Sequence, residues 1–166
     1  AGLQSSATLN VLSDGHLSIL TGSPDIGGSR ASMALMAAEV LGIPFEHIHP
    51  QIAATDAVGH CDVTGGSRTT LATGQAVIQA AEQCVAEMCR RAAAEWEVEA
   101  VVVTWSQGAA HYGEQSLTFE ALARRAGTMG GPLTFSSSLT ASSAAPSFGV
   151  HILSLIHISE PTRLGF

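Results

Sequence analysis

The sequence predicts a two-layer α+β domain in which two helices cover one face of a mixed sheet. Short segments of alternating or β-branched residues, which are typical of strands, recur along the chain. Two longer segments carry apolar residues at helical spacing. Taken in chain order, these segments predict β-β-α-β-α-β, followed by a small helix and an end at which we expect the domain to be incomplete.

A hairpin is expected over residues 7–22. Residues 7–12 and 16–20 alternate apolar and polar side chains, and Asp14-Gly15 lies between them. The Asp-Gly pair is a strong hairpin signal when alternating segments flank it.

The first helix is expected over residues 30–41, where apolar residues recur at every third or fourth position. Gly42 suits the position just after a helix, and Pro44 prevents continuation. A short strand over residues 48–53 and a polar loop over residues 54–66 follow.

The second helix is the longer one, over residues 67–95, with a continuous apolar stripe. Residues 101–105 are β-branched and aromatic, which predicts a strand. A short helix is expected over residues 116–126, with Ser116 as its weak capping signal. Residues 134–147 are rich in Ser and Ala and show no clear periodicity.

Composition sets limits on function. The 166 residues are 46% hydrophobic and 13% charged, which suits one ordered domain. The net charge is −7, and all seven basic residues are arginine. We therefore expect no nucleic-acid partner, and no apolar run is long enough to span a membrane. Three cysteines without CxxC spacing fit a reducing, cytoplasmic compartment; periplasmic export stays open as an alternative.

The end of the chain differs in composition from the rest. Alanine is dense up to Ala145 and then stops, and residues 153–163 resemble the translated read-through of a sequencing-library adapter. The alternative is an ordinary apolar strand followed by a proline turn. We expect residues 153–166 to be a non-native tail and residues 1–152 to be part of a domain. The absence of an initiator Met at Ala1 also indicates a piece of a longer polypeptide.

One tetrapeptide occurs twice, each time just before a predicted helix. Gly27-Gly28-Ser29-Arg30 precedes the first helix, and Gly65-Gly66-Ser67-Arg68 precedes the second and continues into Thr69-Thr70. A helix N-terminus has backbone N–H groups without partners and a partial positive charge. Glycines allow close approach of a ligand, hydroxyls add donors, and Arg offers a bidentate fork for phosphate. The pair therefore predicts a site for two anionic groups.

The same positions also allow other interpretations. Each copy taken singly is also an ordinary helix cap, and the duplication is what favours the site. Neither copy is a Walker A loop or a GxGxxG fingerprint. His47, His49, His60 and Cys61 lack the paired spacing of a zinc site, so we expect surface or loop histidines and no metal ligands. Asp25, Asp56 and Asp62 fit caps, turns or polar contacts to a ligand, and the sequence leaves the three roles open.

A family resemblance follows from these motifs. Residues 21–30 and 37–44, residues 62–70 with 74–77, and residues 146–151 resemble the large, molybdopterin-binding subunit of the xanthine dehydrogenase/aldehyde oxidase family of molybdenum hydroxylases. The likeness covers roughly residues 5–152. It implies a two-layer molybdenum-cofactor-binding domain with the β-β-α-β-α-β order.

The resemblance also implies a site and a cofactor. The cofactor-binding residues it implies are Gly27, Gly28, Ser29, Arg30, Gly65, Gly66, Ser67, Arg68, Thr69 and Thr70. In bacterial members the cofactor is molybdopterin cytosine dinucleotide with Mo, whose pyrophosphate suits a site for two anions. The catalytic Glu of the family lies downstream of this chain, so no catalytic residue is expected here.

Activity and partners are implied for the parent enzyme. It would hydroxylate an aldehyde or an N-heterocycle with oxygen from water. Electrons would pass to [2Fe-2S] centres and FAD on partner subunits or domains, in a dimer of heteromers. We expect the chain alone to be inactive. The rival hypothesis is a non-enzymatic anion- or nucleotide-binding module that uses the same two helix N-termini.

Overall fold

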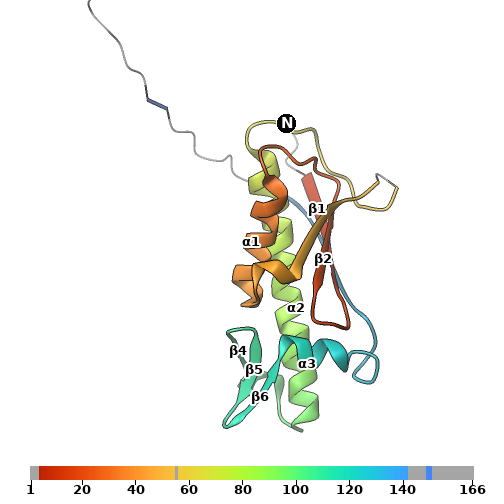
Figure 1. Cartoon of the computed structure of the whole chain (residues 1–166), viewed down its shortest axis with the longest axis vertical. Helices are drawn as coiled ribbons and strands as arrows, with labels where there is room; N and C mark the ends of the chain where they lie inside the picture. The colour runs from red at the N-terminus through yellow and green to blue at the C-terminus, as the bar shows by residue number, and fades with distance from the viewer. Residues whose placement is uncertain (1–3, 55, 142–148, 151–166) are drawn as a thin grey trace, which may run out of the picture.

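The computed structural model describes residues 4–54, 56–141 and 149–150 and confirms the predicted fold class. A four-stranded sheet has the order β3 (Ile48–Ile52), β2 (Leu17–Thr21), β1 (Gln4–Val11) and β7 (Leu133–Thr140). β3 runs parallel to β2, and the other pairs are antiparallel. Helices α1 (Ser29–Leu41) and α2 (Gly74–Glu95) pack side by side against this sheet (Figure 1). A smaller sheet and a short helix lie near the far end of α2 (Figure 1).

The predicted hairpin is confirmed as β1 (Gln4–Val11) and β2 (Leu17–Thr21). Its loop differs from the two-residue turn that Asp-Gly favours. Gly15 has φ +84 and donates its N–H to the Leu12 carbonyl at 3.0 Å, which makes a three-residue loop with a left-handed last residue. The inward positions of both strands are apolar and buried: Ala7, Leu9, Leu17 and Ile19.

Helix α1 (Ser29–Leu41) and strand β3 (Ile48–Ile52) lie where the sequence predicts them. Gly42 has φ +68 and donates its N–H to the Ala38 carbonyl at 2.8 Å, so a left-handed residue closes the helix. A short 3₁₀ turn (Phe45–His47) then leads into β3.

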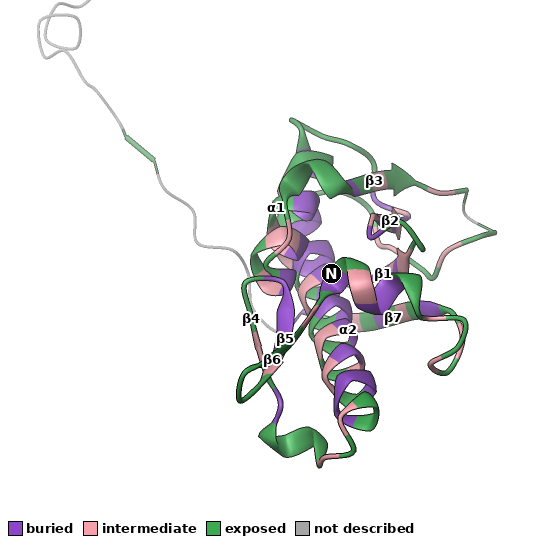
Figure 2. Ribbon diagram, turned by 60° about the horizontal axis from the view of Figure 1, so that its bottom comes forward, coloured by how far each residue is buried: buried purple, intermediate pink, exposed green. Residues whose placement is uncertain are grey.

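A π-helical turn over Thr69–Thr73 leads directly into helix α2 (Gly74–Glu95), and together they confirm the long predicted helix. We call residues 65–70, just before and within this turn, the start of α2. The two helices approach closely at Gly74, where an added Cβ would lie 2.6 Å from Met36 Sδ. Buried residues line the inward faces of α1 and α2 (Figure 2). No helix in the described ranges is long and apolar enough to span a bilayer.

The strand predicted over residues 101–105 is largely wrong. Ala100–Val102 is a 3₁₀ turn with Val101 87% exposed, and β4 is only Thr104–Ser106. Val101 and Val102 are exposed, whereas Val103 is buried in the core, so strand propensity does not decide the conformation here.

Two further strands were not predicted. β5 (Ala109–Tyr112) and β6 (Gln115–Thr118) complete the small antiparallel sheet with β4. Helix α3 (Phe119–Arg124) starts later than expected. Its cap is Thr118, whose hydroxyl accepts the Ala121 N–H at 3.2 Å, and Ser116 lies in β6 instead.

Strand β7 (Leu133–Thr140) falls in the stretch for which no periodicity was seen. It pairs with β1 along its whole length, and Leu133 and Ser137 are buried while the residues next to them are more exposed. Its alternation is hidden in the sequence because a serine occupies an inward position. The predicted non-native tail, residues 153–166, lies outside the described residues.

Candidate functional site

The two Gly-Gly-Ser-Arg copies come together at one end of the molecule. α1 and α2 run in the same direction, and both begin at the top of Figure 1. Ser29 and Arg30 from the first helix start and Thr69 and Thr73 from the second line one small cavity. The predicted juxtaposition of two helix N-termini is therefore present in the structure.

Both helix starts have the same backbone turn, but it is displaced by one residue along the tetrapeptide. Ser29 N–H donates to the Ile26 carbonyl at 3.3 Å, and Arg68 N–H donates to the Gly65 carbonyl at 3.1 Å. Two left-handed residues precede each of these positions. The sequence repeat aligns Ser29 with Ser67, whereas the structure aligns Ser29 with Arg68.

This displacement puts a serine where the first copy has a glycine. Gly28 has φ +80, and its structural counterpart Ser67 has φ +61. A non-glycine residue in this region costs on the order of 1 kcal/mol and is often found at functional sites. The second loop therefore stores backbone strain that the first loop avoids.

The start of α1 is closed by a carboxylate of its own loop. Asp25 Oδ1 accepts the Arg30 backbone N–H at 3.0 Å, and Asp25 Oδ2 accepts Arg30 Nε at 2.8 Å. The backbone bond from Arg30, followed by its side-chain bond, holds the pKa of Asp25 below its usual value. Ala31 N–H donates to the Gly28 carbonyl at 3.0 Å. The first turn of α1 therefore already contains its anion, and Asp25 has the role of a cap.

The start of α2 has no such cap. Arg68 and Leu71 N–H groups donate to the carbonyls of Gly65 and Ser67. The N–H groups of Thr69 and Thr70 have no acceptor within the ranges that the structure covers. Thr64 stands at the structural counterpart of Asp25. Two helix N–H groups are thus available to an anion at α2.

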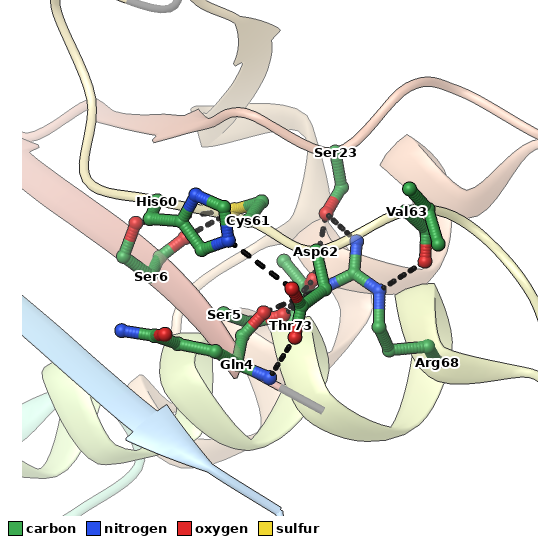
Figure 3. A network of polar contacts seen from close by, with 10 residues as sticks. All are labelled: Gln4, Ser5, Ser6, Ser23, His60, Cys61, Asp62, Val63, Arg68 and Thr73. Carbon is green, nitrogen blue, oxygen red and sulfur yellow. Dashed lines mark hydrogen bonds and ion pairs between the residues drawn. The ribbon is translucent and has the colours of Figure 1, made fainter. Parts of the chain in front are cut away.

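The side chain of Arg68 points into the protein, away from the open end of the helix. The residue is 1% exposed, and its guanidinium donates to four protein oxygens (Figure 3). Nε donates to the Val63 carbonyl at 3.0 Å and Nη1 to the Gln4 carbonyl at 3.0 Å. Nη1 also donates to Ser5 Oγ, and Nη2 to Ser23 Oγ at 3.4 Å. The fork expected for a phosphate is therefore engaged by the protein itself.

Hydroxyl groups extend this network beneath the second loop. Thr73 Oγ1 lies 2.8 Å from Ser23 Oγ and donates to Ser5 Oγ at 3.1 Å (Figure 3). Ser5, Ser23 and Thr73 are all buried. Arg68 thereby ties the second loop to β1 and to the first loop. Sequence reasoning missed these three residues. The available signal was Ser5, which lies two positions before Ala7 and so continues the inward alternation of the predicted strand 7–12.

Arg30 has the opposite orientation. Its side chain is 52% exposed, and only Nε is bound, to Asp25. Its two Nη groups have no partner among the residues described, so the guanidinium can still donate to an anion.

The four glycines of the two copies face open space. A Cβ added at Gly27, Gly28, Gly65 or Gly66 would meet nothing within 4 Å. A ligand can therefore approach the backbone of both loops closely. Together with the free N–H groups at α2, these surfaces fit a phosphorylated group.

The other sequence candidates lie elsewhere or have partners. His47 and His49 are exposed and stack on His16, with ring centroids 4.8 and 5.0 Å apart. His60 Nε2 bonds Asp62 Oδ1 at 3.1 Å. Burial raises the pKa of Cys84 to about 12, as expected of a core thiol. Within residues 4–54, 56–141 and 149–150, no three His, Cys, Asp or Glu side chains form a group able to hold a metal.

Comparison with known proteins gives a family and a fold. Residues 1–160 match the sequence model of the molybdopterin cofactor-binding domain. Xanthine dehydrogenases of Drosophila subobscura and Drosophila pseudoobscura pseudoobscura are 40% and 38% identical over 81 residues, 48% of this chain and 6% of theirs. The chain thus spans a small part of these relatives.

Two solved structures share the fold. The reconstituted CO dehydrogenase of Oligotropha carboxidovorans superposes with a TM-score of 0.77 at 23% identity, over 84% of this chain and 18% of that one. Quinoline 2-oxidoreductase of Pseudomonas putida 86 gives 0.71 at 18% identity, over 85% and 19%. The resemblance read from the motifs is confirmed. The chain belongs to the molybdopterin cofactor-binding domain family, a domain of the xanthine dehydrogenase family of molybdenum hydroxylases.

Proposed function

We propose that the start of α2 binds the phosphate groups of the molybdenum cofactor. The observation that carries the proposal is the pair of N–H groups of Thr69 and Thr70 at an uncapped helix start. Gly65 and Gly66 let the anion approach, and the exposed Ser67 and Thr70 hydroxyls add donors. Arg68 holds this loop from inside, as a positioning residue.

The first loop supplies a second contact in this proposal. Gly27 and Gly28 present open backbone, and the free Nη groups of Arg30 face solvent beside them. Ser29 keeps the loop in shape, because its hydroxyl accepts the Ile26 N–H at 3.1 Å. Two anion contacts at neighbouring helix starts suit a pyrophosphate, so we propose the cytosine dinucleotide form of the cofactor.

The parent protein, in this proposal, is a molybdenum hydroxylase that acts on an aldehyde or an N-heterocycle. When bound, the cofactor supplies the two-electron oxidation, and this domain contributes binding and orientation. Iron-sulfur and FAD subunits or domains are the proposed electron acceptors, in a dimer of heteromers, and we place the enzyme in the cytoplasm. The chain by itself should turn over no aldehyde or purine, because its match spans only 6% of the length of the xanthine dehydrogenases that it resembles.

The test is retention of the cofactor by the chain. The chain is mixed anaerobically with molybdopterin cytosine dinucleotide released from a bacterial molybdenum hydroxylase, and molybdenum, pterin and CMP are measured per chain after ultrafiltration. Gly66→Asp places a negative charge where the anion would approach, and retention should fall at least about ten-fold.

The matched control is Gly113→Asp. Gly113 has φ +57, as Gly66 does, and also faces open space, but it lies in the β5–β6 turn of the small sheet. This variant should retain the cofactor as the wild type does. No retention by the wild type, or equal retention by both variants, contradicts the proposal. Retention of free CMP or pyrophosphate without the pterin would instead support the anion-binding module.

A further inference from the structure

The hydroxyl of Thr69 has no hydrogen-bond partner although it is buried. The residue is 6% exposed, and among the side chains of the described residues its Oγ1 is the one buried N or O atom without a partner. A buried hydroxyl without a partner costs about 1–3 kcal/mol, so proteins rarely leave one in that state. The unpaired Thr69 hydroxyl therefore indicates a bound group that forms a hydrogen bond with it.

Thr69 is one of the residues that line the small cavity between the two helix starts. The other polar lining residues come from four parts of the fold: Thr21 and Ser23, Ser29 and Arg30, Gln51, and Thr73. The cavity has a volume of about 10 Å³, enough for one water molecule and too small for a phosphate. The size thus separates this cavity from the open anion site outside the loops.

The charges around the cavity disfavour a cation, since Arg30 is among the lining residues, and the cavity is too small for a phosphate. No carboxylate lines it, and Ser23, which does, accepts from the buried guanidinium of Arg68 at 3.4 Å. A cation would be repelled there and would lack a counter-charge. The hydroxyls can donate as well as accept, which matches the bonding of water.

We propose that this cavity binds one ordered water molecule, hydrogen-bonded to Thr69 Oγ1, which joins α1, β3 and α2 beneath the two loops. Buried waters make about three hydrogen bonds, and the lining groups supply that number. The proposal does not depend on the cofactor, because it concerns a cavity that the cofactor is too large to enter.

The test is Thr69→Val, which replaces the hydroxyl by a methyl group of nearly the same shape. If water bonds the hydroxyl, the variant removes a partner from a buried water, and Tm should fall by several degrees. If the hydroxyl is unsatisfied, the variant removes a buried polar atom that costs stability, and Tm should rise. An unchanged or raised Tm overturns the proposal.

A control and a direct measurement complete the test. Thr70→Val makes the same chemical change at the next, exposed position and should leave Tm within about 1 °C. In the wild type, the Thr69 amide should show a cross-relaxation peak to a long-lived water. Thr69→Val should lose that peak and Thr69→Ser should keep it. A wild type without the peak overturns the proposal whatever the Tm values.

Discussion

The starts of α1 and α2 share a sequence and a backbone turn but differ in what closes them. At α1, Asp25 binds the helix N–H of Arg30 and pairs with the exposed Arg30 side chain. At α2, Thr64 stands in place of Asp25, and the N–H groups of Thr69 and Thr70 are open. In the proposed function the two starts therefore contribute differently: α2 offers backbone N–H groups to the anion, whereas α1, whose N–H is held by Asp25, offers the free Nη groups of Arg30.

The largest expected difference concerns the two arginines of the repeat. Arg68→Met should destabilise the protein by about 3 kcal/mol, because it leaves the buried oxygens of Gln4 and Ser5 without their donor. Arg30→Met, at an exposed ion pair, should cost less than about 0.5 kcal/mol. Urea unfolding of both variants measures the two values. Similar losses of unfolding free energy in the two variants would contradict the difference in burial between the two side chains.

The next largest effect concerns the C-terminal half of α2, whose contribution to the free energy of unfolding should depend on acid pH. Arg90, then Arg91, bond the carboxylate of Glu87 and lower its pKa from 4.5 to about 2. A lowered pKa contributes stability that is present above pH 4.5 and is lost as the pH falls towards 2. Since Glu87 is partly exposed, the loss should be on the order of 2 kcal/mol. Unfolding measured from pH 6 to pH 2 should show this loss in the wild type and not in Glu87→Gln.

Gly28 and Ser67 are structural counterparts with positive φ, and exchanging Gly and Ser at these two positions should change stability in opposite directions. Ser67→Gly removes the strain at φ +61 and should stabilise the protein by roughly 0.5–1 kcal/mol. Gly28→Ser adds the same strain at φ +80 and should destabilise it by about 1 kcal/mol. Thermal unfolding of the pair checks the one-residue displacement. Equal shifts in Tm would mean that the loops are aligned as the tetrapeptide suggests.

The smallest effect is local. Because the pKa of Asp25 is lowered by its bond from the Arg30 N–H, protonation below the usual value of 3.8 should remove that bond. The Arg30 amide resonance should therefore titrate with Asp25 in acid, while the Thr69 amide should not follow such a titration. A titrating Thr69 amide would reveal a carboxylate cap at α2 as well.

Local patterns in the sequence predicted most of the main layer. The hairpin, α1, β3 and α2 depend on periodicity and turn residues within a short window, and all four were found. Strand β7 was missed because Ser137 occupies an inward position and its pairing partner β1 is more than a hundred residues away. The small sheet depends on pairing between short segments whose own patterns are weak.

The sequence predicted where the candidate site lies but not how its side chains and backbone turns are arranged. The Gly-Gly-Ser-Arg repeat located both loops. It could not show that Arg68 is buried, because the partners of its guanidinium, Ser5 and Ser23, are brought in by other elements. Nor could identical tetrapeptides reveal that their turns are displaced by one residue.

The most direct test of the account is to give α2 the cap that α1 has. Thr64→Asp places a carboxylate at the counterpart of Asp25, within reach of the Thr69 N–H. It should raise stability by about 1 kcal/mol. In the wild type, inorganic pyrophosphate should shift the amide resonances of Thr69 and Thr70 more than that of Arg30. In Thr64→Asp these shifts should need at least about ten-fold more pyrophosphate. Unchanged binding by Thr64→Asp, or the largest shift at Arg30, would contradict the account.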